Sequence, residues 1–131
     1  MDTKFNFNSQ VCTDKNQSER LLALGLKKET ADMMYEGMAE GELPRIMPHK
    51  TEMDCFNLWD SIIPAWSLHR LVSLTNTDDI KSACNEKHCW GGNVLKIAQR
   101  KAFEKDNLYD NIVDCIEWLI KKGYFPKEYL V

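Results

Sequence analysis

The fold of this chain is decided above all by residues 107–123, NLYDNIVDCIEWLIKKG. Apolar side chains recur in this stretch at spacings of three and four, which is the period of an amphipathic helix. They are Tyr109, Ile112, Val113, Ile116, Leu119 and Ile120. Asn107 or Asp106 can cap the first turn, and Gly123 can end the last turn, where two lysines favour the negative helix terminus. The stretch therefore predicts a helix over roughly 108–122.

A second strongly apolar segment spans residues 58–74, LWDSIIPAWSLHRLVSL. Ser67 is a suitable N-cap for a short helix, whose apolar face would consist of Leu68, Leu71 and Val72. Each large side chain that becomes buried contributes roughly 2–3 kcal/mol, so we expect this segment to anchor the core. The two helices are expected to pack on each other or on a sheet through Trp66, Leu71, Ile116 and Leu119.

The N-terminal third of the chain contains two further helix signals. Ser18 suits an N-cap, the leucines after it supply an apolar face, and Gly25 suits a C-cap, so a helix is predicted between them. A second helix is predicted near 28–39. Its apolar face would comprise Ala31, Met34 and Met38, beside an acidic stripe of Asp32, Glu36 and Glu40.

Glycine and proline indicate turns between these segments. Residues 41–57 contain Gly41, Pro44 and Pro48, which disfavour a helix, so we expect a loop there. This loop is expected to pack on the body of the protein through Leu43, Ile46 and Met47.

Two short strands are also indicated. The Gly91-Gly92 pair lies between residues 87–90 and 94–98, an arrangement typical of a β-hairpin. A helix over 93–105 is the alternative, because that stretch is rich in helix-forming residues. Near the N-terminus, Phe5 and Phe7 alternate with polar residues as in a strand.

Length and composition are those of one ordinary globular domain. The chain has 131 residues, of which 44% are hydrophobic, and a chain of this size can bury one core. We therefore expect a single domain over 1–131, of the α+β class. It would contain three or four helices and a small antiparallel β-hairpin or sheet.

Charge and cysteine content exclude several classes of protein. The net charge of −3 does not favour non-specific nucleic-acid binding, which requires a strongly basic surface. The N-terminus lacks the apolar run of a signal peptide, and no apolar stretch approaches the length of a membrane span. An odd number of cysteines, five, argues against a disulfide framework. We expect a soluble cytoplasmic protein that contacts no membrane.

Three stretches resemble a known group of proteins: residues 17–26 followed by 29–33, residues 63–71, and residues 111–124. Their sequences are QSERLLALGL followed by ETADM, IPAWSLHRL, and NIVDCIEWLIKKGY. Together they look like small uncharacterised proteins of Bacteroides-type gut bacteria and of their phages or mobile elements. This resemblance covers less than half of the chain. It implies an accessory protein of phage or mobile-element origin, and it supplies no catalytic residues.

A zinc site is the sharpest chemical hypothesis. Cys84, His88 and Cys89 place two thiols and an imidazole within a spacing that zinc ligands can adopt. A fourth ligand would have to come from Cys55, His49 or His69. Structural zinc sites usually have two compact ligand pairs, and only one is present here, so unpaired thiols are the simpler interpretation. We therefore expect no metal and no other cofactor.

Catalysis is not indicated by any motif. Cys115 lies on the apolar side of the helix over 108–122, where burial would keep its thiol neutral and inert. Cys89 would be the better nucleophile, with Lys87 or His88 beside it to lower its pKa. However, no oxyanion hole, orienting acid or phosphate-binding glycine loop is indicated. We expect the protein not to be an enzyme.

A DNA-binding regulator is a further alternative. A helix, a turn at Gly25 and a second helix would resemble a helix-turn-helix motif. The second of these helices is acidic, however, and phosphates would repel it. Nucleic acid is therefore an unfavoured partner.

Binding to another protein is the function we favour from the sequence. Four tryptophans exceed what a small core usually hides completely, and exposed aromatic residues are common anchors at interfaces. Trp66 and Trp90 are the candidate interaction residues. The partner would be an unknown protein or a second copy of the chain.

Overall fold

The computed structural model of the chain describes residues 10–36, 42–76, 80 and 107–131. Its described helices are α1 (Lys15–Ala23), α2 (Lys50–Cys55), α3 (Leu68–Leu74) and α6 (Leu108–Lys122). Its described strands are β1 (Met33–Tyr35), β2 (Arg45–Ile46) and β3 (Ile63–Ala65). Single 3-10 turns occur at Lys28–Thr30, Trp59–Ser61 and Lys127–Tyr129. The predicted α+β class is therefore confirmed.

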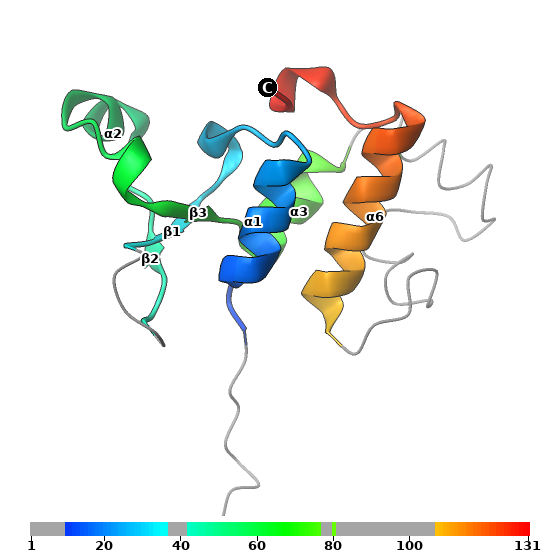
Figure 1. Cartoon of the computed structure of the whole chain (residues 1–131), viewed down its shortest axis with the longest axis horizontal. Helices are drawn as coiled ribbons and strands as arrows, with labels where there is room; N and C mark the ends of the chain where they lie inside the picture. The colour runs from blue at the N-terminus through cyan, green and yellow to red at the C-terminus, as the bar shows by residue number, and fades with distance from the viewer. Residues whose placement is uncertain (1–9, 37–41, 77–79, 81–106) are drawn as a thin grey trace, which may run out of the picture.

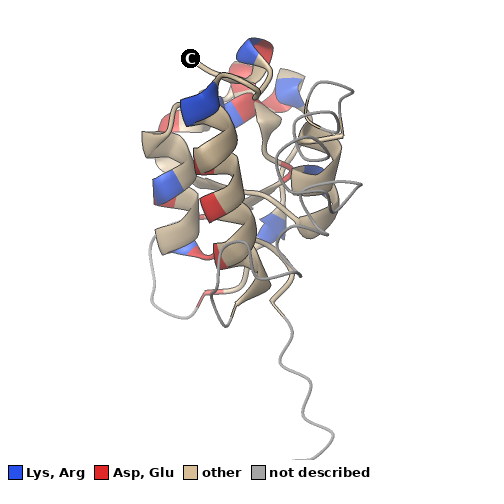
Figure 2. Cartoon of the chain, turned by 90° about the vertical axis from the view of Figure 1, so that its right-hand side faces the viewer, with Lys and Arg blue, Asp and Glu red and all other residues tan. Residues whose placement is uncertain are grey.

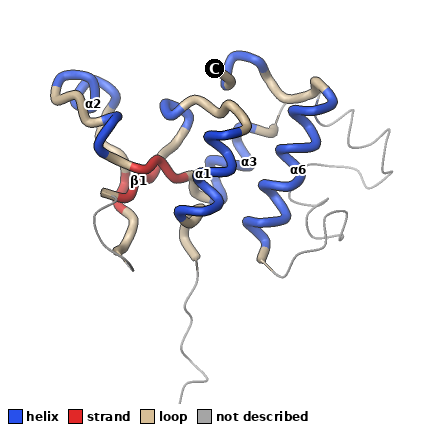
Figure 3. The backbone as a smooth tube through the Cα atoms, in the orientation of Figure 1, coloured by secondary structure: helices blue, strands red, loops and turns tan. Residues whose placement is uncertain are grey.

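The three strands form one small antiparallel sheet in the order β2-β1-β3. Met33 in the central strand lies opposite both Ile46 and Ala65. Figures 1 and 3 show the sheet and α2 at one end of the molecule, and α1, α3 and α6 at the other. We call residues 42–59, which contain β2, α2 and Trp59, the sheet-end segment.

The main core lies among the helices and includes Trp66, the residue directly after β3. Its fully buried side chains include Trp66, Leu71, Ile116 and Leu119, which belong to one cluster. The prediction that these four residues share the interior is confirmed. A smaller buried cluster lies under the sheet and consists of Cys12, Tyr35 and Ala65.

The last helix has the predicted bounds and caps. The Asn107 side chain accepts hydrogen bonds from the amides of Tyr109 and Asp110, and Gly123 ends the helix with φ +80°. The helix packs beside α1, where Arg20 donates to Asp114 over 2.8 Å and to Glu117 over 3.1 Å. Figure 2 shows charged residues of both signs along these helices.

The first helix begins four residues earlier than a cap at Ser18 would place it. Asp14 is the N-cap, and it forms a capping box with Gln17. Ser18 is instead buried inside the helix, where its hydroxyl lies 2.8 Å from Thr13 Oγ1. Gly25 follows the C-cap residue Leu24 with φ +103°, the left-handed geometry expected of a glycine at a helix end.

The helix predicted near 28–39 is wrong. The chain forms one 3-10 turn, Lys28–Thr30, and then the strand β1, in which Met34 lies opposite Arg45 and Pro64. Pairing on both sides makes β1 the central strand, and such tertiary contacts override a weak helical preference. The acidic stripe on a helix face is therefore absent, because Asp32 and Glu36 flank a strand.

The loop prediction for 41–57 is also wrong in part. That region contains β2 and α2, and Leu43 and Ile46 are exposed rather than packed inward. Met47 does pack against the main core, as expected. The predicted hairpin around Gly91-Gly92 and the strand at Phe5 and Phe7 lie outside the described residues.

Candidate functional site: a charged pocket between the sheet and helix α3

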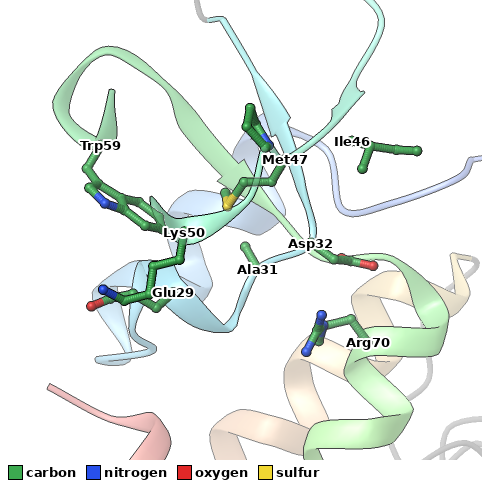
Figure 4. A pocket seen from close by; sticks show the side chains of 9 residues that line it. Glu29, Ala31, Asp32, Ile46, Met47, Lys50, Trp59 and Arg70 are labelled. Carbon is green, nitrogen blue, oxygen red and sulfur yellow. The ribbon is translucent and has the colours of Figure 1, made fainter. Parts of the chain in front are cut away.

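An open pocket of about 280 Å³ lies where the sheet meets α3 (Figure 4). The 3-10 turn at Lys28–Thr30, the start of β1, the β2–α2 connection, Trp59 and α3 all contribute to its walls. The lining residues are Glu29, Ala31, Asp32, Ile46, Met47, Pro48, Lys50, Trp59 and Arg70. The pocket is thus assembled from segments up to 41 residues apart in the chain (Glu29 to Arg70).

The wall beside α3 is built around Asp32 and Ser67. The Ser67 backbone N–H donates to Asp32 Oδ1 over 2.9 Å, and the Ser67 hydroxyl donates to Asp32 Oδ2 over 2.5 Å. Ser67 Oγ also accepts the Arg70 backbone N–H over 3.1 Å, which makes Ser67 the predicted N-cap of α3. Asp32 therefore ties the start of β1 to the start of α3, and both of its carboxylate oxygens already accept hydrogen bonds.

Arg70 presents a guanidinium group to the same pocket. The residue is half-buried, and its Nε atom is shielded from solvent. Within the described part of the chain, this Nε has no hydrogen-bond partner. Leaving a buried donor unsatisfied costs about 1–3 kcal/mol, so the guanidinium has unused capacity to bind an acceptor.

The opposite wall is the indole of Trp59, held in place by polar contacts. Its Nε1 donates to Asp54 Oδ1 over 2.8 Å, and Lys50 Nζ donates to Asp54 Oδ2 over 2.8 Å. Lys28 Nζ donates to the Trp59 carbonyl over 3.3 Å. The hydrogen bond from Lys50 and, to a smaller extent, the one from Trp59 lower the pKa of Asp54. The carboxylate that positions the indole therefore stays ionised at neutral pH.

The lining combines charged and apolar side chains. It contains two acidic residues, Glu29 and Asp32, and two basic ones, Lys50 and Arg70. The other lining residues are apolar. A mixed apolar and charged wall of this kind can hold a small group that carries its own charge.

Trp66 does not lie at the surface, where it was expected to be available to a partner. Its side chain is fully buried, the indole N–H donates to Thr30 Oγ1 over 2.9 Å, and its backbone N–H donates to Thr13 Oγ1 over 3.0 Å. These internal partners explain why the residue lies in the core: both of its N–H groups are satisfied without solvent. Trp90 lies outside the described residues.

The zinc hypothesis concerns Cys84, His88 and Cys89, which also lie outside the described residues. The possible fourth ligands His49, His69 and Cys55 are all exposed. Across residues 10–36, 42–76, 80 and 107–131, no three histidine, cysteine or acidic side chains gather in a way that could hold a metal ion.

The buried cysteines behave as interior residues. Cys115 is fully buried, as predicted from its place in the apolar stripe. Cys12, which the sequence did not single out, is buried beside Tyr35, and burial raises the pKa of its thiol. A raised pKa leaves little thiolate at neutral pH, so Cys12 does not suit nucleophilic chemistry.

Sequence reasoning missed the pocket residues as a group. Asp32 had been placed on a helix face, Trp59 among core residues, and Arg70 had no assigned role. One local signal was available. Ser67 is the N-cap of α3, and an N-cap fixes the backbone position of the residue three places later, which is Arg70. The contact between Asp32 and Ser67 depends on the β1–β3 pairing, which has no local signature.

No protein-family model matches this chain, and no curated protein or solved structure is detectably similar to it. None of the helices that the structure describes combines the length and the apolar character needed to cross a bilayer. The functional conclusion therefore depends on the geometry of the chain itself.

Proposed function

We propose that the protein is a non-enzymatic accessory protein that binds another protein through the sheet-end segment, residues 42–59. One observation carries this proposal. Of the five exposed large hydrophobic residues in the described part of the chain, three belong to this segment: Leu43 (82% exposed), Ile46 (80%) and Phe56 (70%). Exposed apolar side chains concentrated in one segment are typical of an interaction surface.

The sheet-end segment is held in a defined conformation, which favours recognition. Met53 of α2 is completely buried, and its backbone N–H donates to the His49 carbonyl over 3.0 Å. The His49 side chain caps the helix by accepting the Thr51 amide. Because the segment is already ordered, binding would cost little conformational entropy.

Contacts through side chains are favoured over the addition of a strand to β2. The Met47 N–H points inward and donates to the Asp32 carbonyl over 3.0 Å. Pro44 and Pro48 have no N–H, so between them Ile46 alone can present a backbone donor at the outer edge. Prolines in such positions protect sheet edges from pairing. A partner would therefore pack on Ile46, Leu43 and Phe56.

Site-specific photocrosslinking in living cells tests the proposal. A photoreactive phenylalanine analogue replaces Ile46 or Phe56 in the full chain, and Val11 or Val131 in the controls, which are also exposed and apolar but lie outside the segment. We expect one protein to crosslink at positions 46 and 56 and not at the controls. Crosslinking to a second copy of the chain alone, or with equal yield at all four positions, would refute a dedicated surface for another protein.

The captured protein is then purified and mixed with the purified chain. We expect the double variant Ile46→Ser and Phe56→Ser to weaken the affinity by at least about tenfold, since truncating interface anchors typically costs more than 1 kcal/mol. The matched variant Val11→Ser and Val131→Ser should bind like the wild type. Equal affinity of the two double variants, measured by calorimetry, would contradict the proposal.

A further inference from the structure

We infer that the pocket between the sheet and α3 binds a carboxylate on an apolar stem, presented by the partner polypeptide, with Arg70 as its ligand. The inference rests on the proposed function and adds the chemistry that the partner must carry. Ile46 connects the two sites, because it is exposed on the interaction surface and also lines the pocket.

The first support is the state of the Arg70 side chain. Its Nε is shielded from solvent, and no hydrogen bond to that atom comes from the part of the chain that the structure describes. Figure 4 shows the guanidinium on the pocket side of α3. An arginine fork matches the two oxygens of a carboxylate, and such charge-assisted bonds are roughly twice as strong as neutral ones. Arg70 lines the pocket, so a carboxylate that enters it would supply an acceptor for the guanidinium group.

The second support is that Asp32, one of the two acidic residues of the pocket, is engaged elsewhere. Both oxygens of Asp32 accept hydrogen bonds from Ser67. The pKa of Lys50 is raised mainly by its hydrogen bond with Asp54. The negative charge of the nearby Glu29 makes a smaller contribution. Lys50 is already paired with Asp54, so among the basic residues of the lining Arg70 is the one left to receive an incoming carboxylate.

The third support is the apolar surface beside the guanidinium. Ala31, Met47 and Pro48 line the pocket together with the indole of Trp59. The Nε1 atom of this indole donates a hydrogen bond to Asp54, so the apolar wall is in place before a ligand enters. A methylene or aromatic stem would bury its surface here while its carboxylate reaches Arg70.

A phosphate is a poorer match for the same pocket. Phosphate sites usually combine several backbone N–H groups with basic side chains. Here the amides of Ser67 and Arg70 already donate to side chains within the protein, and two carboxylates border the space. The arrangement therefore favours a singly charged acid.

Peptide probes test the inference on the full-length chain by nuclear magnetic resonance. The first pair is acetyl-Phe-Glu-Phe-amide and its neutral match acetyl-Phe-Gln-Phe-amide. The second pair is acetyl-Phe-Phe as the free acid and as the amide, which separates a terminal carboxylate from a side-chain carboxylate. We expect at least one acid to shift the Trp59 indole and Arg70 Nε–H signals, with the neutral match binding at least about tenfold more weakly.

Arginine variants make the test specific to the pocket. Arg70→Gln should reduce the affinity for the acid by at least about tenfold, and Arg70→Lys should fall between it and the wild type. Arg45→Gln is the control, because Arg45 pairs with Glu36 and does not line the pocket. Circular dichroism establishes that each variant is folded.

Three outcomes would overturn the inference: neutral peptides that bind as well as the acids, Arg70→Gln binding like Arg45→Gln, or inorganic phosphate binding more tightly than either acid. If these occur while crosslinking at positions 46 and 56 persists, protein binding stands and the carboxylate assignment fails. If the acids bind through Arg70 but no protein crosslinks, the proposed function fails instead.

Discussion

The indole nitrogen of Trp66 donates a hydrogen bond to Thr30 Oγ1 over 2.9 Å in the interior of the protein. The Thr30 hydroxyl in turn donates to the Lys27 carbonyl over 2.7 Å. The buried Thr30 hydroxyl thereby provides the acceptor for the indole N–H of Trp66, the largest side chain of the core. The same hydroxyl stabilises the 3-10 turn that precedes β1. Thr30 thus couples the core to the segment that carries Glu29, Ala31 and Asp32 to the pocket.

Replacing Thr30 tests this coupling. Thr30→Val keeps the shape of the side chain but leaves the Trp66 N–H without an acceptor, so we expect a loss of about 1–3 kcal/mol in the free energy of unfolding. Thr30→Ser retains the hydroxyl and should lose less. Urea unfolding measures both variants. A valine variant as stable as the serine variant would show that the indole N–H finds another partner.

Alkaline pH is expected to unfold the protein through Tyr35. Burial raises the pKa of this phenol well above that of a free tyrosine, and the hydrogen bond with Cys12 is the second largest cause. A raised pKa means that the folded state keeps a proton that the unfolded state releases. The stabilisation is therefore complete below the ordinary tyrosine pKa of about 10, and it is lost as the pH rises beyond that value toward the pKa of the folded state.

The Tyr35→Phe variant isolates this effect. Phenolate absorbance is measured against pH for the variant and for the wild type. The difference between the two titrations should show that Tyr35 ionises only as the protein unfolds. The variant should lose less stability than the wild type between neutral and strongly alkaline pH. A Tyr35 that ionised in the folded protein at the pH of a free phenol would contradict the buried contacts with Cys12 and the Thr13 carbonyl.

Gly123 is expected to be needed for its backbone geometry alone. Its φ of +80° is left-handed, and a Cβ placed there would meet no atom within 4 Å. Gly123→Ala should therefore destabilise the protein by about 1–2 kcal/mol through backbone strain without a clash. Asparagine tolerates this conformation better, so Gly123→Asn should cost less. Thermal unfolding compares the two, and an alanine variant as stable as the wild type would exclude strain at this position.

The accuracy of the sequence predictions followed the range of the interactions involved. Helix α6 was predicted with its bounds and caps, because its apolar stripe, Asn107 and Gly123 are all local signals. Ser67 was identified as the cap of α3 for the same reason. The segment around Met34 was mistaken for a helix, because its partners Arg45 and Pro64 lie far along the chain.

The candidate site shows the same limit more sharply. Asp32, Trp59 and Arg70 are separated along the chain, and each looks ordinary in its own segment. Trp66 was expected at a surface from the number of tryptophans, yet Thr30 and Thr13 satisfy its N–H groups inside the protein. Composition cannot distinguish a buried tryptophan with polar partners from an exposed one. The predicted roles of Cys84, His88, Cys89 and Trp90 stay predictions.

The amino-acid sequence alone determined the α+β class, the helices α3 and α6, and the four side chains that join them in the core. These features follow from periodicity and capping, which act over a few residues. The tertiary structure alone decided that Met33–Tyr35 forms the central strand, that Trp66 is buried, and that Asp32, Trp59 and Arg70 surround one pocket. Strand pairing and the satisfaction of buried polar groups depend on partners distant in the chain, so no local pattern could reveal them.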